Sequence, residues 1–255
     1  MTTQDLAMSS YEGRMPRQPS RTAERLFFGG MAALLCLVVF IGFAPTFFAA
    51  GFVQAPLPNP LVRVHGIVFT AWMVLLVTQA ALVPTGRMAW HRSLGIVAFA
   101  LPPLMIVLGV ITAIDALGRK VTIGSLDPAT SLALPLLNIT AFAILIAAAW
   151  RARRRPDAHK RLVVLATISL STAALGRIPW AQVDLPPAAG PVIGLAALIL
   201  LLVAYDVLSL RRVHRSTRWA APLAFAAGAF AVPFGMTPAW HHFAEFLVRA
   251  AVPYV

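Results

Sequence analysis

Residues 128–150 read PATSLALPLLNITAFAILIAAAW, and none of these 23 residues is Asp, Glu, Lys or Arg. A helix that crosses a bilayer needs about 20 predominantly apolar residues, so this stretch predicts a transmembrane helix. The basic run RARRRPDAHKR follows at residues 151–161. Because basic loops of membrane proteins stay on the cytoplasmic side, the run predicts that this helix ends at the cytoplasmic face.

The same pattern recurs along the chain. Of all residues, 59% are hydrophobic and 12% are charged, against about 45–50% and about 25% in soluble domains. This composition excludes a secreted scaffold, a cytosolic enzyme and a disordered chain, and a single cysteine cannot form an internal disulfide. Seven stretches carry no charged residue: 26–62, 64–86, 93–114, 128–150, 162–176, 185–205 and 219–244.

These stretches predict an all-α integral membrane bundle of seven transmembrane helices. Residues 1–25 are expected to be a disordered cytoplasmic tail, residues 26–240 the seven-helix transmembrane domain, and residues 241–255 a short amphipathic C-terminal segment. Four prolines in residues 45–60 predict an apolar loop, because proline removes a helix hydrogen bond. Asp157 is expected to cap a helix. The predicted spans lie at about 26–44, 61–84, 91–115, 128–150, 158–180, 188–209 and 218–240.

The basic residues predict the orientation. With seven spans, 16 of the 21 Lys and Arg residues fall in the N-terminal tail and the even-numbered connections. The positive-inside rule then places the N-terminus in the cytoplasm and the C-terminus outside. The net charge of +12 therefore indicates topology and contact with anionic lipid head groups, and we expect no nucleic-acid partner. Tryptophan agrees with an aromatic belt: Trp90, Trp150 and Trp219 fall at inner ends, Trp180 and Trp240 at outer ends.

Few polar side chains occur in the spans, and each is costly in lipid. In this topology His91, His159 and Asp206 lie near the cytoplasmic face, whereas an outer group holds His65, Arg177, Asp184, His241 and His242. Paired histidines on neighbouring helices suit the axial positions of haem b. The candidate cofactor-binding residues are His91, His159, His65, Asp206 and Arg177.

Each candidate has a suggested role. Asp206 would accept a hydrogen bond from the non-ligating ring nitrogen of a histidine and so fix its tautomer. Arg177 would pair with a haem propionate. Their ordinary alternatives stay open. Histidine in the first turn of a helix is often only an interfacial residue, and Arg177 can snorkel to the outer interface.

Spacing predicts which faces turn inward. His65, Trp72 and Gln79 are seven residues apart and share one stripe of a helix, and we expect that stripe to avoid lipid. His159 and Arg177, eighteen residues apart, are expected to share an inward face of another helix.

A weak internal repeat relates two parts of the chain. Thr70-Ala71-Trp72 precedes His91-Arg92 by 21 residues, and Thr140-Ala141-Phe142 precedes His159-Lys160 by 19. Each unit reads as an inward-running helix, a basic turn, and a helix entered through histidine and a cation. Duplication and chance similarity between apolar helices both explain it.

Two other classes of function remain open beside haem or metal binding. Gln79 and Asn138, with proline-kinked helices, would suit a non-redox binding or transport protein with a central polar cavity. A structural or assembly factor would bind its partner through the helices themselves. Phosphate-binding glycine loops, nucleophile elbows and zinc-protease motifs do not occur.

Six blocks of sequence resemble a family of uncharacterised bacterial multi-pass inner-membrane proteins. That resemblance covers nearly the whole chain after about residue 25, and it implies an inner (cytoplasmic) membrane location but no known activity. In that family the position of Asn138 is often acidic, and His241 and His242 lie outside the pattern. The histidine-led helix entries are also remotely similar to di-haem transmembrane b-type cytochromes. The blocks are 42–47 (GFAPTF), 65–72 (HGIVFTAW), 86–95 (GRMAWHRSLG), 158–162 (AHKRL), 204–206 (AYD) and 237–240 (TPAW).

Overall fold

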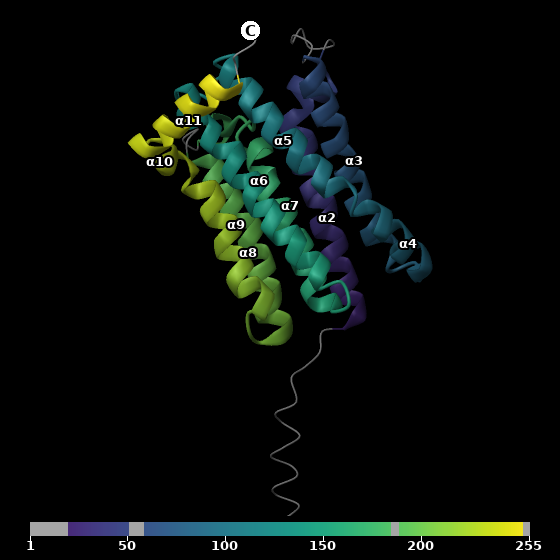
Figure 1. Cartoon of the computed structure of the whole chain (residues 1–255). Helices are drawn as coiled ribbons and strands as arrows, with labels where there is room; N and C mark the ends of the chain where they lie inside the picture. Colours follow the sequence, from purple (N-terminus) through teal and green to yellow (C-terminus); the bar gives the residue numbers. More distant parts are fainter. Residues whose placement is uncertain (1–19, 51–58, 185–188, 252–255) are drawn as a thin grey trace, which may run out of the picture.

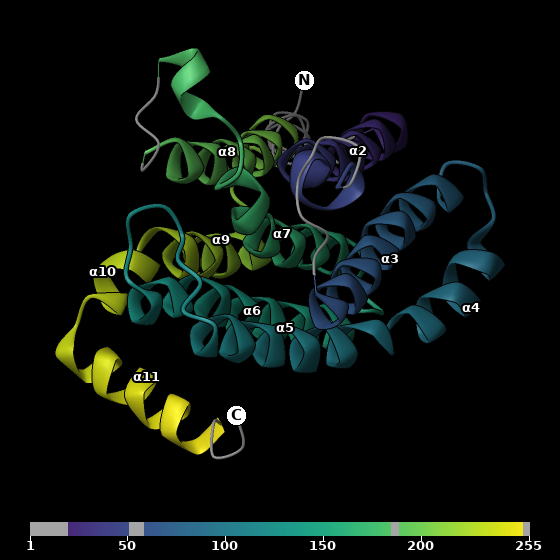
Figure 2. The ribbon, with the colours of Figure 1, turned by 90° about the horizontal axis from the view of Figure 1, so that it is seen from above.

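The computed structural model describes residues 20–50, 59–184 and 189–251, and within these ranges the chain is helical with no strand. Most helices run side by side, α4 splays away from the others, and α11 lies across one end (Figures 1 and 2). The elements are α2 (Arg21–Phe43), the π-helix η1 (Ala44–Phe48), α3 (Pro60–Leu82), α4 (Met88–Ala98), α5 (Leu101–Gly118), α6 (Pro128–Arg151), α7 (Pro156–Leu175), the 3₁₀-helix η2 (Trp180–Val183), α8 (Gly190–Leu210), α9 (Arg215–Ala229), α10 (Ala231–Gly235) and α11 (Pro238–Ala251).

Five helical units are long and apolar enough to cross a membrane: α2 with η1, α3, α4 with α5, α6, and α8. Their outer surfaces carry large exposed apolar side chains, including Ile67, Leu104 and Leu200. A surface of this kind suits lipid. The expectation of an all-helical membrane protein is therefore confirmed.

Helix α7 lies at the centre and packs against α2, α6, α8 and α9. Its buried side chains include the hydroxyls of Thr167, Ser169 and Ser171, each of which donates to a backbone carbonyl within the helix. Trp72 of α3 donates its indole N–H to Thr167 Oγ1 at 3.2 Å. Other helices cover nearly every face of α7. This helix can therefore carry polar side chains without exposing them to lipid.

Prolines break the helices at three points. Near Pro45 the α-helix α2 gives way to the π-helix η1, which continues to Phe48, where a loop was expected. Residues 51–58 of that expected loop lie outside the described part. The third predicted span bends at Phe99–Ala100, just before Pro102 and Pro103. The seventh breaks around Phe230, three residues before Pro233. Proline lacks the N–H that continues a helix ladder, which explains each position.

Several predicted boundaries were wrong. Helix α2 begins at Arg21, capped by Ser20, so residues 21–25 do not belong to a tail. Arg155 occupies the N-cap position of α7, and Asp157 lies in its first turn, not at the cap. The same helix ends at Leu175, five residues before the expected end. The amphipathic segment begins at Pro238.

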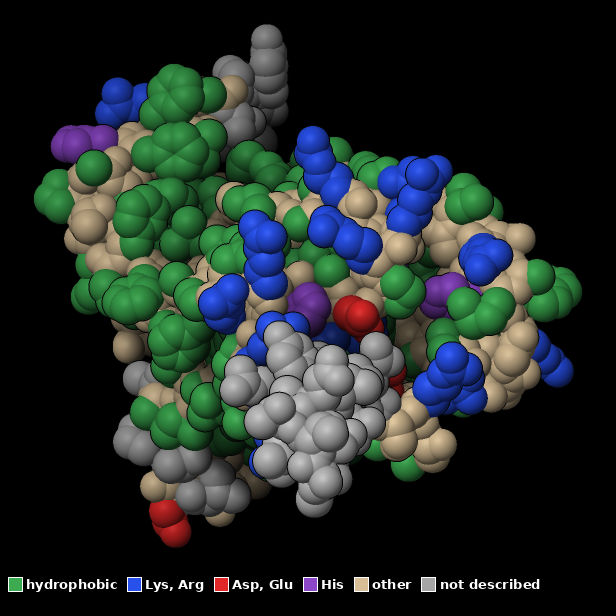
Figure 3. Space-filling model, turned by 90° about the horizontal axis from the view of Figure 1, so that it is seen from below, with side chains coloured by type: hydrophobic (Ala, Val, Ile, Leu, Met, Phe, Trp, Pro, Cys, Tyr) green, Lys and Arg blue, Asp and Glu red, His purple; other side chains and the backbone are tan. Residues whose placement is uncertain are grey.

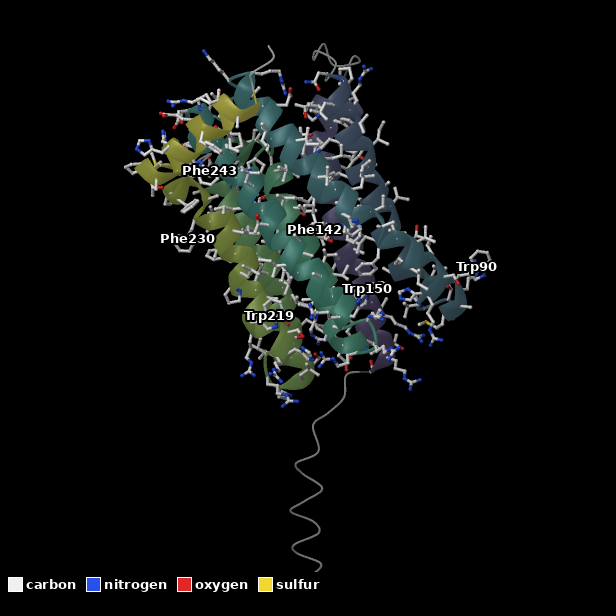
Figure 4. The ribbon with its side chains drawn as sticks, viewed as in Figure 1. Trp90, Phe142, Trp150, Trp219, Phe230 and Phe243 are labelled. Carbon is white, nitrogen blue, oxygen red and sulfur yellow. The ribbon has the colours of Figure 1, made fainter. Side chains whose placement is uncertain are left out.

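Corresponding positions of the internal repeat meet in the core. The rings of Trp72 and Phe142 pack edge to face with centroids 5.7 Å apart, and Phe142 lies in the middle of the bundle (Figure 4). Trp72, on the predicted inward stripe, is buried, and its stripe-mates His65 and Gln79 are half-buried against protein. The two corresponding positions of the repeat are thus in direct contact.

Candidate functional site

Basic side chains gather at one end of the bundle (Figure 3). The start of α2 and the α3–α4, α6–α7 and α8–α9 connections all lie there (Figure 1). This end, which we call the basic end, also holds His91, His159 and Asp206 from the predicted inner group. The arrangement brings three helix entries, those of α4, α7 and α9, to one level.

A buried ion pair joins α7 and α8 at the basic end. Arg161 Nε and Nη2 lie 2.8 and 2.7 Å from Asp206 Oδ1, and the two side chains are 2% and 0% exposed. Arg161 Nη1 also donates to the Asp157 carbonyl at 2.8 Å. A buried charge is tolerated only when it is paired and hydrogen-bonded, and this pair meets that condition.

The second oxygen of Asp206 binds the start of α9. Asp206 Oδ2 accepts from Thr217 Oγ1 at 2.6 Å and from the His214 backbone N–H at 3.0 Å. One carboxylate therefore ties α7, α8 and α9 together. Asp206 was expected beside the candidate histidines, but both its oxygens are committed to Arg161, Thr217 and the His214 backbone.

Helix α2 covers this ion pair with aromatic rings. Phe27 stacks on Tyr205 with ring centroids 4.0 Å apart, and the Arg161 guanidinium lies 5.6 Å from the Phe28 ring. Next to them Lys160 forms an ion pair with Glu24 of α2. As part of the basic run 151–161, Arg161 and Lys160 were predicted to set the topology and to contact anionic lipid head groups. Their partners lie 45 and 136 positions away, so no local pattern could reveal them.

His91 and His159 make the same contact at the two repeat positions. His91 Nδ1 lies 3.3 Å from the Gln79 carbonyl of α3, and His159 Nδ1 lies 2.9 Å from the Ala149 carbonyl of α6. In each case an imidazole at a helix entry fastens the helix to the one before it. We call these two contacts the histidine clips.

The contacts of Nδ1 bear on the other ring nitrogen of each histidine. His159 Nδ1 faces the Ala149 carbonyl, which can only accept, so Nε2 is the unprotonated nitrogen of a neutral ring, the state that binds metals. His91 Nδ1 also faces the Gln79 side-chain amide, which donates to it when the amide oxygen is turned to Gly95, so in His91 the protonated nitrogen is Nε2. The Phe99 ring lies 6.3 Å from that of His159. His91 and His159 both lie at the basic end, at the starts of α4 and α7, and their approach to one shared centre stays a prediction.

The predicted outer residues do not form one group. His65 stacks on Phe69 at 4.0 Å and lies within electrostatic range of Arg177, which sits 4.5 Å from the Phe43 ring. Arg177 follows the end of α7, so it shares no helix face with His159, contrary to prediction. His241 contacts Thr130 at 3.4 Å instead.

His65 keeps one unusual feature. Among the described residues its buried Nδ1 has no hydrogen-bond partner. The Phe47 ring occupies the space over the neighbouring Gly66. The space beside Gly66 is therefore filled by a side chain of η1 and is not an open site.

Gln79 and Asn138, the two polar residues expected to line a transport cavity, have different contact partners on different helices. Gln79 lies against His91 and Gly95, and with its amide oxygen turned to Gly95 it accepts that N–H at 2.9 Å. Asn138 donates to the Leu134 carbonyl of its own helix at 2.7 Å. Gln79 thus belongs to the α3–α4 clip, whereas Asn138 lies inside α6.

His214 predicts a pH dependence of stability. Its Nδ1 accepts from the Ser216 N–H at 3.1 Å and caps α9. Burial, then Arg161, lower the pKa of His214 from its ordinary 6.5, against the opposing charges of Asp206 and Asp157. Protonation therefore favours the unfolded chain. The cap, worth about 1 kcal/mol, is present above pH 6.5 and is lost as the pH falls through the lowered pKa.

Thermal unfolding in detergent at pH 7.5 and pH 5 tests this expectation. The control is His214→Asn, because asparagine caps helices well and does not titrate. The native chain should lose more stability on acidification than the variant does. Equal losses in both would contradict the role of His214.

Comparison of the chain with protein-family models, curated proteins and solved structures finds no match. Within the described ranges, no cluster of three or more His, Cys, Asp or Glu side chains is arranged to hold a metal ion.

Proposed function

We propose that the chain is a seven-span protein of the bacterial inner membrane with its N-terminus in the cytoplasm. Two further helical units would complete the seven spans beside the five apolar ones. The first is α7, and the second is α9 together with α10. Each has 20 residues, or about 30 Å of helix at 1.5 Å per residue, which matches the hydrocarbon core. The gathered basic side chains support a cytoplasmic basic end. A reporter fused after Val255 should be active only outside the cytoplasm, and cytoplasmic activity would overturn the topology.

We further propose that the basic end binds a haem-type cofactor through His91 and His159, as a membrane electron carrier. The observation that carries this proposal is the pair of histidine clips. His159 Nδ1 has a carbonyl as its partner, and metal-binding histidines are commonly oriented in this way. His91 stands at the matching position of the repeated motif and is held by Gln79.

The donor set favours haem over a bare metal ion. A structural zinc site takes four protein ligands and a catalytic one takes three, but haem b needs only two axial imidazoles from the protein. Apolar and aromatic surface suits the macrocycle, and Phe99 and Trp150 supply it, with ring centroids 4.6 Å apart. Arg153, whose guanidinium lies 4.5 Å from the Trp150 ring, offers a cation for a propionate. When bound, haem would supply one-electron redox chemistry.

The optical spectrum of the purified protein tests the cofactor. We expect a Soret band, its loss in His91→Ala and His159→Ala, and its retention in His242→Ala, whose exposed ring lies on α11. Circular dichroism of each variant shows whether the helices persist. A protein without a Soret band, or a band that survives both clip variants, would overturn the haem proposal.

One observation favours an alternative, non-redox binding function. An apolar groove of about 770 Å³ lies between α3 and the bend that joins α4 to α5, lined by Ala71, Leu75 and Ala98 among others. Its size is within the range of small-molecule sites, about 300–1,000 Å³. A colourless preparation that carries a stoichiometric apolar molecule, detected by mass spectrometry and lost in Ala98→Trp, would favour this alternative.

A further inference from the structure

Helix α11 presents three different faces along its length. Trp240, Ala244 and Leu247 recur at helical spacing and pack against α5 and α6. A second face carries His242, Glu245 and Arg249, all exposed. The third carries Phe243 and Phe246, which are 43% and 63% exposed. The apolar and polar exposed faces are adjacent, and neither is covered by the described chain.

Specific contacts hold α11 in this orientation. The Trp240 indole N–H donates to the Ala129 carbonyl at 2.7 Å. Thr130 Oγ1 donates to the Gly235 carbonyl just before α11, at 3.2 Å. The α6 partners in these two contacts, Ala129 and Thr130, both lie in the first turn of that helix. The exposed faces of α11 therefore point in directions fixed by the bundle.

The position and length of α11 suit the boundary between lipid and water. It lies at the end of the bundle opposite the basic end, beside the end of α5 and the start of α6, and it runs across that end (Figures 1 and 2). Its 14 residues make about 21 Å of helix, too short to cross about 30 Å of hydrocarbon. Exposed Phe230 and Phe234 continue the apolar surface towards α9, and Phe230 and Phe243 lie on the same side of the bundle (Figure 4).

We propose that α11 is an interfacial helix that lies in the membrane surface and inserts Phe243 and Phe246 among lipid acyl chains. Its partner is the bilayer itself. An interfacial helix needs an apolar face in the acyl region and a polar face among the head groups, and α11 shows both beside the face that docks on the bundle. The inference uses the membrane location of the chain but not the haem proposal.

Site-specific fluorescence tests the depth of each face. Cys36 is the only cysteine, so a Cys36→Ala background accepts single cysteines labelled with an environment-sensitive fluorophore. The test variant is Phe246→Cys and the matched control is Glu245→Cys, the neighbouring residue, which lies about 100° around the helix on the polar face. Both leave the docking contacts of Trp240 and Thr130 intact. The full chain is reconstituted in phosphatidylethanolamine–phosphatidylglycerol vesicles, with and without brominated acyl chains.

The proposal predicts opposite quenching at the two sites. The label at position 246 should emit at shorter wavelength and be quenched several-fold more by brominated lipid than the label at position 245, which iodide should quench instead. Equal iodide quenching at both sites would place α11 in water and overturn the proposal. A label at position 246 shielded from both quenchers would also overturn it, in favour of a protein partner.

Discussion

Replacing Asp206 with asparagine should lower the free energy of unfolding by about 3–5 kcal/mol, the cost of leaving one partner of a buried ion pair without its counter-charge. Arg161 is 2% exposed and cannot reach water without moving α2 or α9. Asparagine keeps the shape of the side chain but replaces one acceptor oxygen by an NH2 donor, so the loss comes from the charge and from the hydrogen bonds that this oxygen accepted. Chemical unfolding in detergent, followed by circular dichroism, measures it.

Two comparisons make the Asp206 result specific. Asp157→Asn changes an aspartate whose side chain is 73% exposed, and exposed pairs contribute about 0–1 kcal/mol, so little change is expected. The double variant Arg161→Met with Asp206→Asn removes both charges and keeps an acceptor for Thr217 and the His214 N–H, so it should recover most of the lost stability. A single variant as stable as the native chain would show that the ion pair does not hold the basic end together.

Gly42→Ala should destabilise the protein by about 1–3 kcal/mol, the usual cost of overpacking. A Cβ at Gly42 would lie 2.8 Å from the Ala174 Cα of α7. That obstacle is backbone, so α2 must move away from α7 to relieve the clash. We expect a lower thermal midpoint in detergent, with helix content unchanged at low temperature.

Gly30 on the same helix provides the matched control. A Cβ there meets nothing within 4 Å, and alanine favours helix over glycine by about 1 kcal/mol. Gly30→Ala should therefore raise the thermal midpoint or leave it unchanged. If both variants behaved alike, the close crossing of α2 and α7 would not limit stability.

The sequence predicted the apolar helices well because their signal is local. A stretch of about 20 apolar residues needs no partner to be recognised, and α6 was placed within one residue of its observed end. Helix α7 was harder. Its span contains Arg161 and several hydroxyls, and only the packing of four neighbours explains why these side chains occur there.

The site was predictable only in part, for the same physical reason. His91 and His159 were paired because their motifs repeat along the chain, and each does contact the helix before it, whereas their shared centre stays a prediction. The Arg161–Asp206 contact joins residues 45 positions apart, and nothing in either local sequence indicates the other. The breaks near Phe99 and Phe230 were foreseeable as proline effects, but whether a proline bends or ends a helix depends on its neighbours.

The burial of α7 has a consequence for biogenesis. An arginine or aspartate costs about 2.5–3.5 kcal/mol at the centre of a helix that enters lipid alone from the translocon, and Arg161, near the entry of α7, has its counter-charge on α8. During synthesis α7 therefore emerges before the residue that neutralises it. We expect α6 and α7 to integrate as a hairpin, fastened by His159, and α7 to remain near the translocon until α8 arrives.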